Sequence, residues 1–272
     1  MIRSLIEIIT SNAGCFRQTL VLASITSRKK YKSTDLGWLW SFMRPVMYIL
    51  VYYVAISIGF RHSKNIDGLV CPYFIWLAVG IVAFFYMRGM ILGGSNCFQK
   101  NRLIIRNTTY PVAAIPFMTA LSEMIVHVIL MGGVFIYVML MGVAPSIYWL
   151  QIPIYTALML LVSTIWAFGA GLLTLLTKDF YNFLSSINMA FFWLSGILFN
   201  VKGDSVGEKT RLVMRFNPIS YIVEGYRNAI CRHIWIFEEP REFGCFMITL
   251  TVMLLVALFL YTKLKHRIRE LF

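Results

Sequence analysis

The stretch RKKYKSTDLGWLWSFMRPVMYILVYYVAISIGF, residues 28–60, determines how the chain is placed in its surroundings. It opens with a basic cluster, continues through Trp38 and Trp40, and ends in residues 46–60, which carry no charge. Cations, then tryptophans, then an uncharged apolar run follow the order of headgroup region, interface and hydrocarbon along a membrane-spanning helix. Because Lys and Arg favour the cytoplasmic side, we expect this helix to enter the membrane from the cytoplasm.

Composition places the whole chain in the membrane class. Of its 272 residues, 59% are hydrophobic and only 14% are charged, and the mean hydropathy is +0.72. Soluble domains carry about 25% charged residues. The formal net charge is +13, and the basic residues gather beside apolar runs. This placement suits anionic membrane lipids better than nucleic acid. We therefore expect an all-α polytopic membrane protein with lipids, and no nucleic acid, among its partners.

Six apolar runs are candidates for transmembrane helices, although the fifth is short for a bilayer that needs about 20 residues. An even number of crossings puts both termini on the same side. Lys and Arg number fifteen in the segments then placed inside and nine in those placed outside, with Arg88 within a span. Both termini are therefore predicted to be cytoplasmic. The predicted spans are 36–60, 72–97, 112–141, 148–176, 183–199 and 243–261.

The N-terminal residues 1–30 are expected to form a unit apart from the six-span domain, residues 31–272. Ile2, Ile6 and Ile9 recur at helical spacing, with charged residues elsewhere on the wheel. This pattern predicts an N-terminal amphipathic helix lying at the interface on the cytoplasmic leaflet. The same stretch mixes charges into too short an apolar run for a cleavable signal peptide.

Residues 200–242 are too apolar for a solvated loop and too charged for a full span. Asn217-Pro218 marks a turn or a helix start, and apolar residues such as Ile219 and Ile222 then recur at helical spacing. We predict a re-entrant helical segment that dips into the outer leaflet before the last span, with its turn shielded by other spans. The alternative is an amphipathic helix lying flat on the outer surface.

Motifs for catalysis and nucleotide binding are missing from the sequence. It contains no GxxxxGK[ST] phosphate loop, no HExxH, no GxSxG elbow and no acidic metal cluster. We therefore expect no enzyme activity, no catalytic or metal-binding residues and no cofactor bound by this chain. Any work must then draw on an external motor, an ion gradient or a partner.

Small and ionisable residues inside the predicted spans mark helix contacts or function. The Gly89-xxx-Gly93 pair either lets another helix approach closely or is merely tolerated in a membrane helix. Glu123 and His127 are one helical turn apart and share a face. An ionisable pair within a membrane suggests a function such as a proton relay. The alternative is that Glu123 and His127 hydrogen-bond each other at a helix contact.

Five cysteines are scattered along the chain without CxxC spacing, so no metal cluster is predicted. Most are expected to be packing residues. Cys71 and Cys231 both fall on the outer side of the predicted topology, which leaves a disulfide between them open.

Aromatic residues make up 15% of the chain, and many fall within the predicted spans. Such rings usually pack helices together. Tyr48 and Tyr52 nevertheless share a helical face, and flat rings with hydroxyl edges also suit sugar rings. Both interpretations stay open for the candidate substrate-path aromatics, which are Tyr48, Tyr52, Phe84, Phe85, Phe191, Phe192 and Trp193.

These motifs, in this order, resemble a known family. The run YKSTDLGWLWSFMRP (31–45) resembles the entry motif of ABC transporter permeases that export cell-surface polysaccharides such as teichoic acid, O-antigen and capsule. The run NPISYIVEGYR (217–227) is similar to the segment before that family's last span. The basic stretch ending at 110–111 and the turn at 178–179 match in order and spacing, so the likeness covers nearly the whole chain.

The resemblance implies a homodimer of six-helix permeases bound to cytosolic ATP-binding-cassette ATPase subunits, which hold the ATP and Mg. It also implies that a coupling helix in 99–111 docks into the ATPase and that 200–242 forms re-entrant helices at the outer exit. The family's Ser-Pro pair near the end of the fifth span is Ser195-Gly196 here, which puts the geometry of a kink there in doubt. The residues implied are Lys100, Arg102 and Arg106 for coupling, Asn217, Pro218, Tyr221 and Arg227 for the exit turn, and Arg28, Lys29, Lys30, Lys32 and Arg44 for the headgroup or pyrophosphate of a lipid-linked glycan.

The resulting functional expectation is a permease subunit of an ATP-driven exporter. It would move a lipid-linked polysaccharide across the cytoplasmic (inner) membrane of a bacterium, with ATP hydrolysed by a separate subunit. Two alternatives stay open: ATP-driven export of a small molecule such as a drug or haem, and a gradient-driven lipid or glycan flippase that uses Glu123 and His127.

Overall fold

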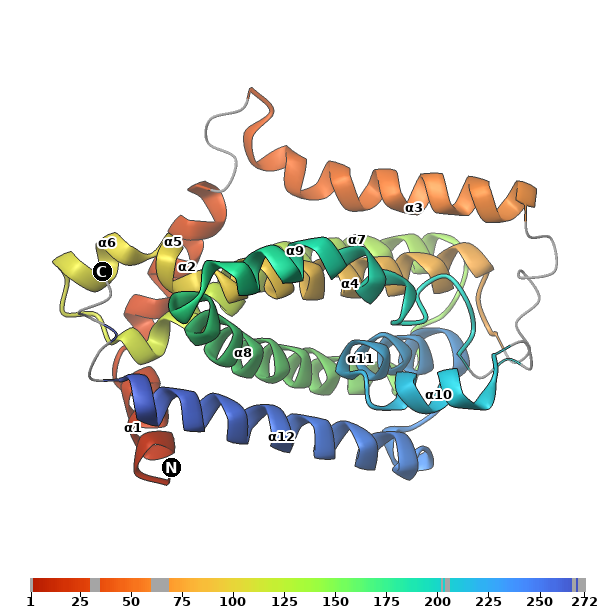
Figure 1. The fold of residues 1–272 in the computed structure, drawn as a ribbon. Coiled ribbons are helices and arrows are strands. Elements are labelled where there is room, and N and C mark those ends of the chain that lie inside the picture. Colours follow the sequence, from red (N-terminus) through yellow and green to blue (C-terminus); the bar gives the residue numbers. More distant parts are fainter. Residues whose placement is uncertain are drawn as a thin grey trace.

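The computed structural model describes residues 2–29, 35–59, 69–201, 203, 206–265 and 268, and within these ranges the regular structure is entirely helical (Figure 1). Long helices run along the molecule, and short helices gather at its two ends (Figure 1). The helices are α1 (Ile2–Gly14), α2 (Phe16–Lys29), α3 (Trp40–Gly59), α4 (Tyr73–Ser95), α5 (Cys97–Lys100), α6 (Arg102–Asn107), α7 (Ile115–Leu140), α8 (Ile152–Leu176), α9 (Lys178–Trp193), α10 (Glu208–Arg215), α11 (Pro218–Arg227) and α12 (Pro240–Leu264). Short turns of helix are η1 (Gly37–Leu39), η3 (Val112–Ala114), η4 (Ile147–Gln151), η5 (Asn228–Arg232, a π-turn) and η6 (Ile236–Glu238).

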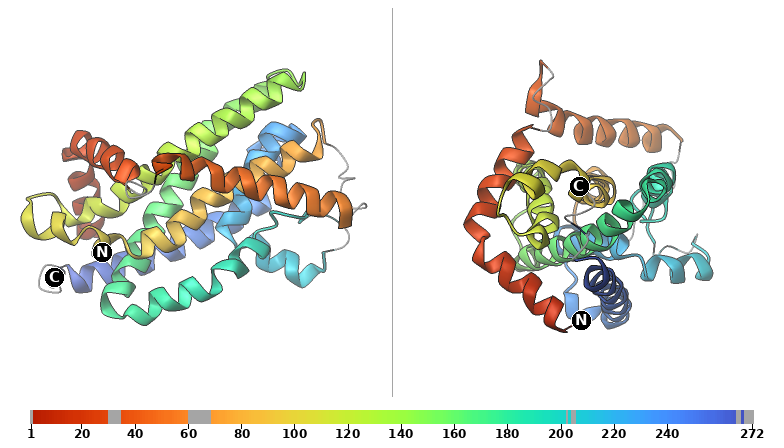
Figure 2. Two further views of the ribbon diagram at one scale, coloured as in Figure 1. Left: turned by 90° about the horizontal axis from the view of Figure 1, so that it is seen from above. Right: turned by 60° about the vertical axis from the view of Figure 1, so that its left-hand side comes forward.

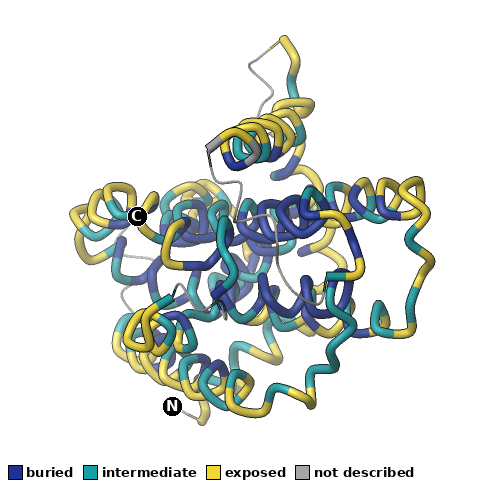
Figure 3. The backbone as a smooth tube through the Cα atoms, turned by 90° about the vertical axis from the view of Figure 1, so that its right-hand side faces the viewer, coloured by how far each residue is buried: buried dark blue, intermediate teal, exposed yellow. Residues whose placement is uncertain are grey.

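Helix α4 is the centre of the bundle. It is apolar around its whole circumference, as expected of a helix surrounded by others, and 78% of its most apolar window is buried. It packs against α7, α8, α9 and α11. Figure 3 shows the buried residues concentrated in the middle of the bundle and the exposed residues along the outlying helices. The core therefore forms around the second predicted span.

Among the described residues, five helical segments are long and apolar enough to cross a membrane, and all five coincide with predicted spans. They are 37–56, 73–95, 112–140, 147–176 and 240–264, the third and fourth with short 3-10 leads that continue into α7 and α8. The prediction of a helical, polytopic membrane protein is confirmed at this level.

The predicted fifth span differs from the helix that forms there. We expected 183–199, whereas α9 begins at Lys178 because the Thr177 side chain accepts a hydrogen bond from the backbone N–H of Asp179 (3.3 Å) and caps the helix. Its 16 residues extend about 24 Å at 1.5 Å per residue, less than the roughly 30 Å of a hydrocarbon core. A sixth crossing therefore stays a prediction.

The N-terminal segment is two helices, and the expectation of a single helix over 1–30 is wrong in this respect. The chain bends at Cys15, where Asn12-Ala13-Gly14 ends α1 with glycine, a poor helix former. Figure 2 shows α2 and α1 following one another around the edge of the bundle. Small and polar side chains face the bundle, whereas Ile2 and Ile9 point away from it, as an interfacial helix requires.

The two ends of the bundle have different contents (Figure 1). One end, which we call the basic end, carries α1, α2, α5, α6 and the last turn of α12. There an ion pair between Lys265 Nζ and Glu7 Oε2 (3.0 Å) joins the end of α12 to α1. The other, which we call the outer end, carries α10, α11 and η5. The first and last helices therefore meet at one end, as the predicted topology demands.

Helix α3 stands beside the bundle rather than within it (Figure 1). Only 22% of its most apolar window is buried, by contacts mainly with α4. Val46, Leu50, Val54 and Ile58 leave an apolar face uncovered. A face of this kind suits lipid or another protein surface.

Candidate functional site

An aromatic cluster joins α3, α4 and α9. The Tyr48 ring lies 5.0 Å from that of Phe85, and the Tyr52 ring lies 5.1 Å from that of Phe192. Phe192 also contacts Phe84 at 5.1 Å between ring centroids. Tyr48 and Tyr52 are 5.9 Å apart on one face of α3, as their spacing predicts. The cluster thus connects the outlying helix α3 to α4 and α9 of the bundle.

A cavity of about 530 Å³ lies between α3, α4 and α7, next to this cluster. Three cationic side chains line it: Arg44 from α3, Arg88 from α4 and Lys100 from α5. Arg88 Nη1 donates a hydrogen bond to Tyr48 Oη (3.3 Å), and its guanidinium lies 5.7 Å from the Tyr48 ring centroid. With the Glu123 carboxylate as the acidic group in its lining, the cavity has a surplus of positive charge.

Of the Gly89-xxx-Gly93 pair, Gly89 makes room for Glu123. A Cβ at Gly89 would lie 2.9 Å from Glu123 Oε2, and one at Gly93 would lie 3.8 Å from Oε1. Gly89 therefore admits the Glu123 carboxylate of α7 at the contact with α4, whereas a Cβ at Gly93 would make only an ordinary van der Waals contact with it. We name the space lined by Arg44, Arg88, Lys100 and Glu123 the cationic cavity.

His127 makes a different contact from the one we considered. Its Nε2 lies 3.1 Å from Tyr226 Oη, and Tyr226 Oη in turn lies 2.7 Å from Thr156 Oγ1. The pair Glu123 and His127 is thus directed to two different neighbours, Glu123 toward the α4 glycines and His127 toward α11. A hydrogen bond between Glu123 and His127 is not what organises this face.

At the outer end, Arg227 is fully buried and holds three parts of the chain together. Its guanidinium donates to the carbonyl oxygens of Trp76 (3.2 Å), Gly196 (2.8 Å) and Ile197 (2.6 Å). Its Cζ lies 3.4 Å from the Trp76 ring centroid. Because a buried guanidinium needs acceptors for its donors, these carbonyls fix α11 against α4 and the end of α9.

Glu224 supplies the charge that Arg227 needs. Its Oε1 lies 2.8 Å from Arg227 Nη1, and its Oε2 lies 2.6 Å from Arg232 Nη1. Burial lowers the pKa of Arg227, while the Glu224 carboxylate acts in the opposite direction. Arg232 also donates to Asn200 Oδ1 (2.9 Å), so the network extends to the chain that follows α9.

The predicted turn at Asn217-Pro218 is confirmed and has a clear role. The Asn217 side chain accepts from the backbone N–H of Ile219 (2.9 Å), which caps α11, and Pro218 occupies the first turn. Asn217 Nδ2 also donates to the Leu194 carbonyl oxygen (3.0 Å). The turn is therefore tied to the end of α9, although Asn217 and Pro218 themselves are only half-buried.

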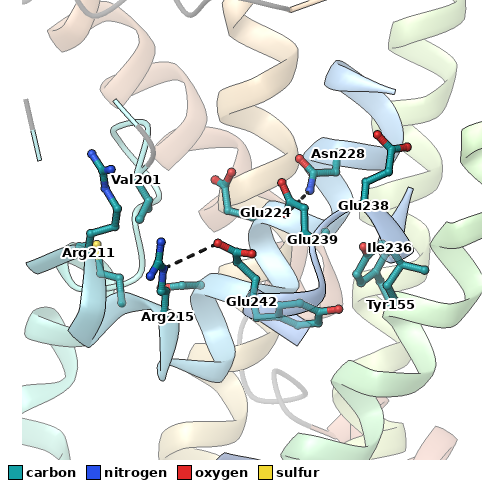
Figure 4. Close-up of a pocket in the computed structure, with 14 residues that line it drawn as sticks. Tyr155, Val201, Arg211, Arg215, Glu224, Asn228, Ile236, Glu238, Glu239 and Glu242 are labelled. Atoms are coloured by element: carbon teal, nitrogen blue, oxygen red, sulfur yellow. Dashed lines mark hydrogen bonds and ion pairs between the residues drawn. The ribbon is translucent and has the colours of Figure 1, made fainter. Parts of the chain in front are cut away.

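A second cavity, of about 400 Å³, lies at the outer end between α10, α11 and α12 (Figure 4). Figure 4 shows four carboxylates around it, from Glu224, Glu238, Glu239 and Glu242. Glu239 accepts a hydrogen bond from Asn228 Nδ2 (3.0 Å), and Glu242 lies 3.7 Å from Arg215. The acidic lining is thus used largely to hold α10 and α12 to the α11 segment.

Tyr221 lies in the wall of this outer cavity. Its ring stacks on Phe246 with 4.4 Å between centroids. Burial raises the pKa of Tyr221 to about 12. The hydroxyl therefore stays protonated at neutral pH.

The predicted surface helix in 99–111 forms as α6. Arg102 and Arg106 are exposed on it, and Leu103 is 66% exposed, whereas Ile105 is buried. The end of the segment is held by a 2.7 Å hydrogen bond between Tyr110 Oη and Thr19 Oγ1. Burial raises the pKa of Tyr110 to about 12. An exposed face of two cations and a leucine on a fixed base is a suitable docking surface for a soluble partner.

A family model described as ABC-2 type transporter matches residues 17–231. The chain belongs to the ABC-2 type transporter family. The match begins in α2 and ends in η5, so it includes the aromatic cluster, the cationic cavity and the pair Glu224 and Arg227. Membership in this family, together with the five membrane-length helices among the described residues, shows a multi-pass membrane protein. Permeases of this family work with a separate ATPase subunit.

Similar proteins share most of their length with this ABC-2 transporter. Two from Klebsiella pneumoniae, each named O-antigen export system permease protein RfbA, are 24% and 23% identical over 261 residues, covering 94% of this chain and 95% of the relative. A protein of the same name from Myxococcus xanthus is 19% identical over 223 residues, covering 81% and 84%. These relatives are bacterial, and we assign this chain to a bacterial membrane.

The structure brings together some, but not all, of the site residues predicted for this ABC-2 transporter. Arg44 and Lys100, predicted for different roles, line the same cavity. Arg28 and Lys29 lie exposed at the end of α2, whereas Lys30 and Lys32 lie outside the described residues. The predicted aromatics that take part in ring contacts are Tyr48, Tyr52, Phe84, Phe85, Phe192 and Trp193, while Phe191 packs half-buried against the core.

Sequence reasoning missed the roles of Arg88, Glu224, Arg232 and Trp76. Arg88 was noted only as a charge within a span, although a cation inside an apolar helix is itself a signal of function. Glu224 and Arg227 are three residues apart on α11, a spacing that predicts contact. No sequence signal joins Trp76 to Arg227, which lie 151 residues apart.

Proposed function

We propose that this ABC-2 transporter chain is the permease subunit of an ATP-driven exporter that moves a lipid-linked polysaccharide outward across the bacterial inner membrane. The observation that carries the proposal is the near full-length similarity to three proteins named O-antigen export permeases. O-antigen itself, teichoic acid and capsular polysaccharide all belong to the substrate class. ATP and Mg are assigned to the partner subunit.

The cationic cavity is the proposed binding place for the phosphate groups of the carrier lipid. Arg44, Arg88 and Lys100 lie around it at the side of the outlying helix α3, where a lipid can reach it from the membrane. Charge-assisted hydrogen bonds from cations to phosphate oxygens are among the strong ones in proteins. Sugar residues would then pass over the rings of Tyr48 and Tyr52, whose flat apolar faces and hydroxyl edges match those of a sugar.

Two features support the proposed assembly. The uncovered apolar face of α3 suits a second copy of the chain, so that a path opens between two bundles. The exposed Arg102, Leu103 and Arg106 of α6 suit docking of the ATPase. In the assembled permease α9 is the proposed sixth crossing, and both termini are cytoplasmic at the basic end.

The α11 segment is the proposed re-entrant element at the exit. It is buried among α4, α8 and α12 at the outer end, and its turn at Asn217-Pro218 is tied to α9. A helix flat on an outer surface would keep an exposed face, whereas residues 222–230 are all buried. Burial on all sides therefore supports the re-entrant arrangement over the flat one.

The test is reconstitution of the chain with its ATPase in lipid vesicles. We expect a lipid-linked polysaccharide to stimulate ATP hydrolysis and to become accessible on the far side of the membrane only with ATP. Stimulation by a drug or haem and not by the glycolipid would support small-molecule export instead. Transport that follows an imposed proton gradient without ATP would support a gradient-driven flippase and overturn the proposal.

A further inference from the structure

Two cysteines far apart in the sequence meet at the outer end of the bundle. The backbone N–H of Val70 donates to the carbonyl oxygen of Cys231 (2.9 Å), which brings the residue after Val70, Cys71, beside Cys231. Cys71 is 8% exposed and Cys231 is 0% exposed, and both belong to one apolar cluster. The two thiols are close enough for each to shift the pKa of the other. This contact joins the chain just before α4 to η5, just after α11.

We propose that Cys71 and Cys231 form a disulfide in the mature protein, so that the pair is an oxidation site on the extracytoplasmic side. Disulfides form and persist outside the cytoplasm, and the outer end faces that compartment in the predicted topology. Two buried cysteines whose backbones are joined by a hydrogen bond one residue away need little rearrangement to bond. The proposal depends on the topology and on this contact, and not on the substrate.

The surroundings of the pair favour Cys71 as the attacking thiol. The neighbouring Cys231 thiol lowers the pKa of Cys71, whereas the neighbouring Cys71 thiol and burial raise the pKa of Cys231. Arg227 and Arg232 lie near Cys231 and favour its thiolate once the first sulfur has reacted. Cys71 is also the less deeply buried of the two.

The oxidant is a protein disulfide of the extracytoplasmic compartment, which reacts by thiol–disulfide exchange. The Cys71 thiolate attacks one sulfur of that disulfide and releases the other as a thiolate, giving a mixed disulfide. The Cys231 thiolate then attacks Cys71 Sγ and expels the second sulfur of the oxidant. Two electrons pass to the oxidant, and the two protons from Cys71 and Cys231 convert its thiolates to a dithiol. Because Cys231 is buried in the folded chain, we place this exchange before α11 packs fully against α4.

The bond would tie the start of the central helix α4 to the end of the re-entrant segment. Arg227 already joins α11 to α4 through the Trp76 carbonyl, one turn into the helix. The disulfide would add a covalent link at the same junction and close a long loop, which constrains the unfolded chain. We therefore expect reductant to lower the midpoint of thermal unfolding of the wild type but not of a Cys71→Ser/Cys231→Ser double variant.

The test counts alkylated cysteines in the denatured full-length chain. Protein is made in a bacterium with an oxidising extracytoplasmic compartment, quenched in acid and labelled with a maleimide of known mass. The chain has five cysteines, so we expect three labels without reductant and five after reduction. Cys71→Ser and Cys231→Ser should each take four labels under both conditions. The matched control Cys245→Ser should take two labels without reductant and four after reduction.

The outcomes separate cleanly. Three labels on the wild type, together with a cross-linked peptide containing Cys71 and Cys231, would support the proposal. Five labels on the unreduced wild type would overturn it, whether the pair faces the cytoplasm or stays reduced outside. A loss of two labels that persists in Cys71→Ser, or a reductant-sensitive dimer, would assign the bond to other cysteines and overturn it as well.

Discussion

Arg227 Nη1 lies 2.8 Å from Glu224 Oε1, at the junction of α4, α9 and α11, with the Arg227 side chain fully buried and that of Glu224 11% exposed. The guanidinium has no exposed surface, and three carbonyl oxygens as well as the Glu224 carboxylate accept from it. A buried charge is tolerated only when it is paired and fully hydrogen-bonded. Arg227 meets both conditions, and it does so by linking segments that are remote in the sequence.

Replacing Arg227 should therefore weaken the fold strongly. Arg227→Met removes one partner of a buried pair and leaves the Trp76, Gly196 and Ile197 carbonyls without their donor. We expect a loss of about 3–5 kcal/mol in the free energy of unfolding. The measurement is the midpoint of thermal unfolding in detergent, with the yield of monodisperse protein as a second readout.

Arg215→Met is the matched control for this change. Arg215 forms the more open ion pair at the outer end, 3.7 Å from Glu242, with side chains 35% and 28% exposed. Pairs in such settings contribute about 0–1 kcal/mol. Equal midpoints for the two variants would show that the Arg227 network does not stabilise the junction.

Gly80 offers an independent test of the same junction, because it gives the Arg227 guanidinium its space. A Cβ at this position would clash with Arg227 Nη2 and lie 2.9 Å from its Cζ. We expect Gly80→Ala to cost about 1–3 kcal/mol, the usual effect of overpacking. At Gly132 in α7 nothing lies within 4 Å of such a Cβ, so Gly132→Ala should be neutral or slightly stabilising. Thermal unfolding of both variants side by side decides the matter, and a neutral Gly80→Ala would contradict the packing described.

Much of this fold could be predicted from sequence because membrane-length helices are a local property. Five of the predicted apolar spans are long helices in the structure. The two residues Asn217 and Pro218 were enough to predict a turn or a helix start, and α11 begins there. The limits of α9 could not be predicted in this way. The Thr177 side chain caps a helix that starts at charged residues, where the sequence pattern predicts a turn. The break at Cys15 also depends on a weak local preference that a long amphipathic pattern hides.

The candidate site was less predictable because its parts come from different helices. Periodicity put Tyr48 and Tyr52 on one face, yet only packing shows that Phe192 of α9 meets them. Likewise, Arg44 and Lys100 belong to separate motifs in the sequence but line the same cavity in the folded chain. Long-range proximity of this kind leaves no trace in a single sequence.

Charge reversal on α6 should separate ATP hydrolysis from export. Arg102→Glu or Arg106→Glu replaces an exposed cation on the proposed docking surface, where the folded permease itself does not need it. We expect the purified complex to retain basal ATP hydrolysis, or to lose its ATPase subunit, while export falls at least about tenfold, which corresponds to 1.4 kcal/mol of lost coupling. Export and ATP turnover are measured on the same vesicles.

The control for that experiment is Lys178→Glu. Lys178 is an exposed cation at the first residue of α9, predicted to lie on the same side of the membrane as α6 but on a different helix. It should leave both activities near the wild-type level. Wild-type export by Arg102→Glu and Arg106→Glu would show that α6 is not the coupling helix.

The last prediction concerns the cationic cavity. Arg88→Gln removes a guanidinium that donates to Tyr48 Oη and borders the space shared with Arg44 and Lys100. If the cavity binds carrier phosphates, losing one hydrogen bond to a charged group should cost about 1.5–3 kcal/mol, or roughly 10- to 100-fold in the substrate concentration that half-stimulates ATP hydrolysis. Tyr48→Phe keeps the ring but removes the hydroxyl that accepts from Arg88, so we expect a smaller shift in the same direction. Because Tyr48 and Arg88 touch, the double variant should cost less than the sum of the two. A half-stimulating concentration unchanged in Arg88→Gln, in protein with a wild-type unfolding midpoint, would exclude the cavity as the phosphate site.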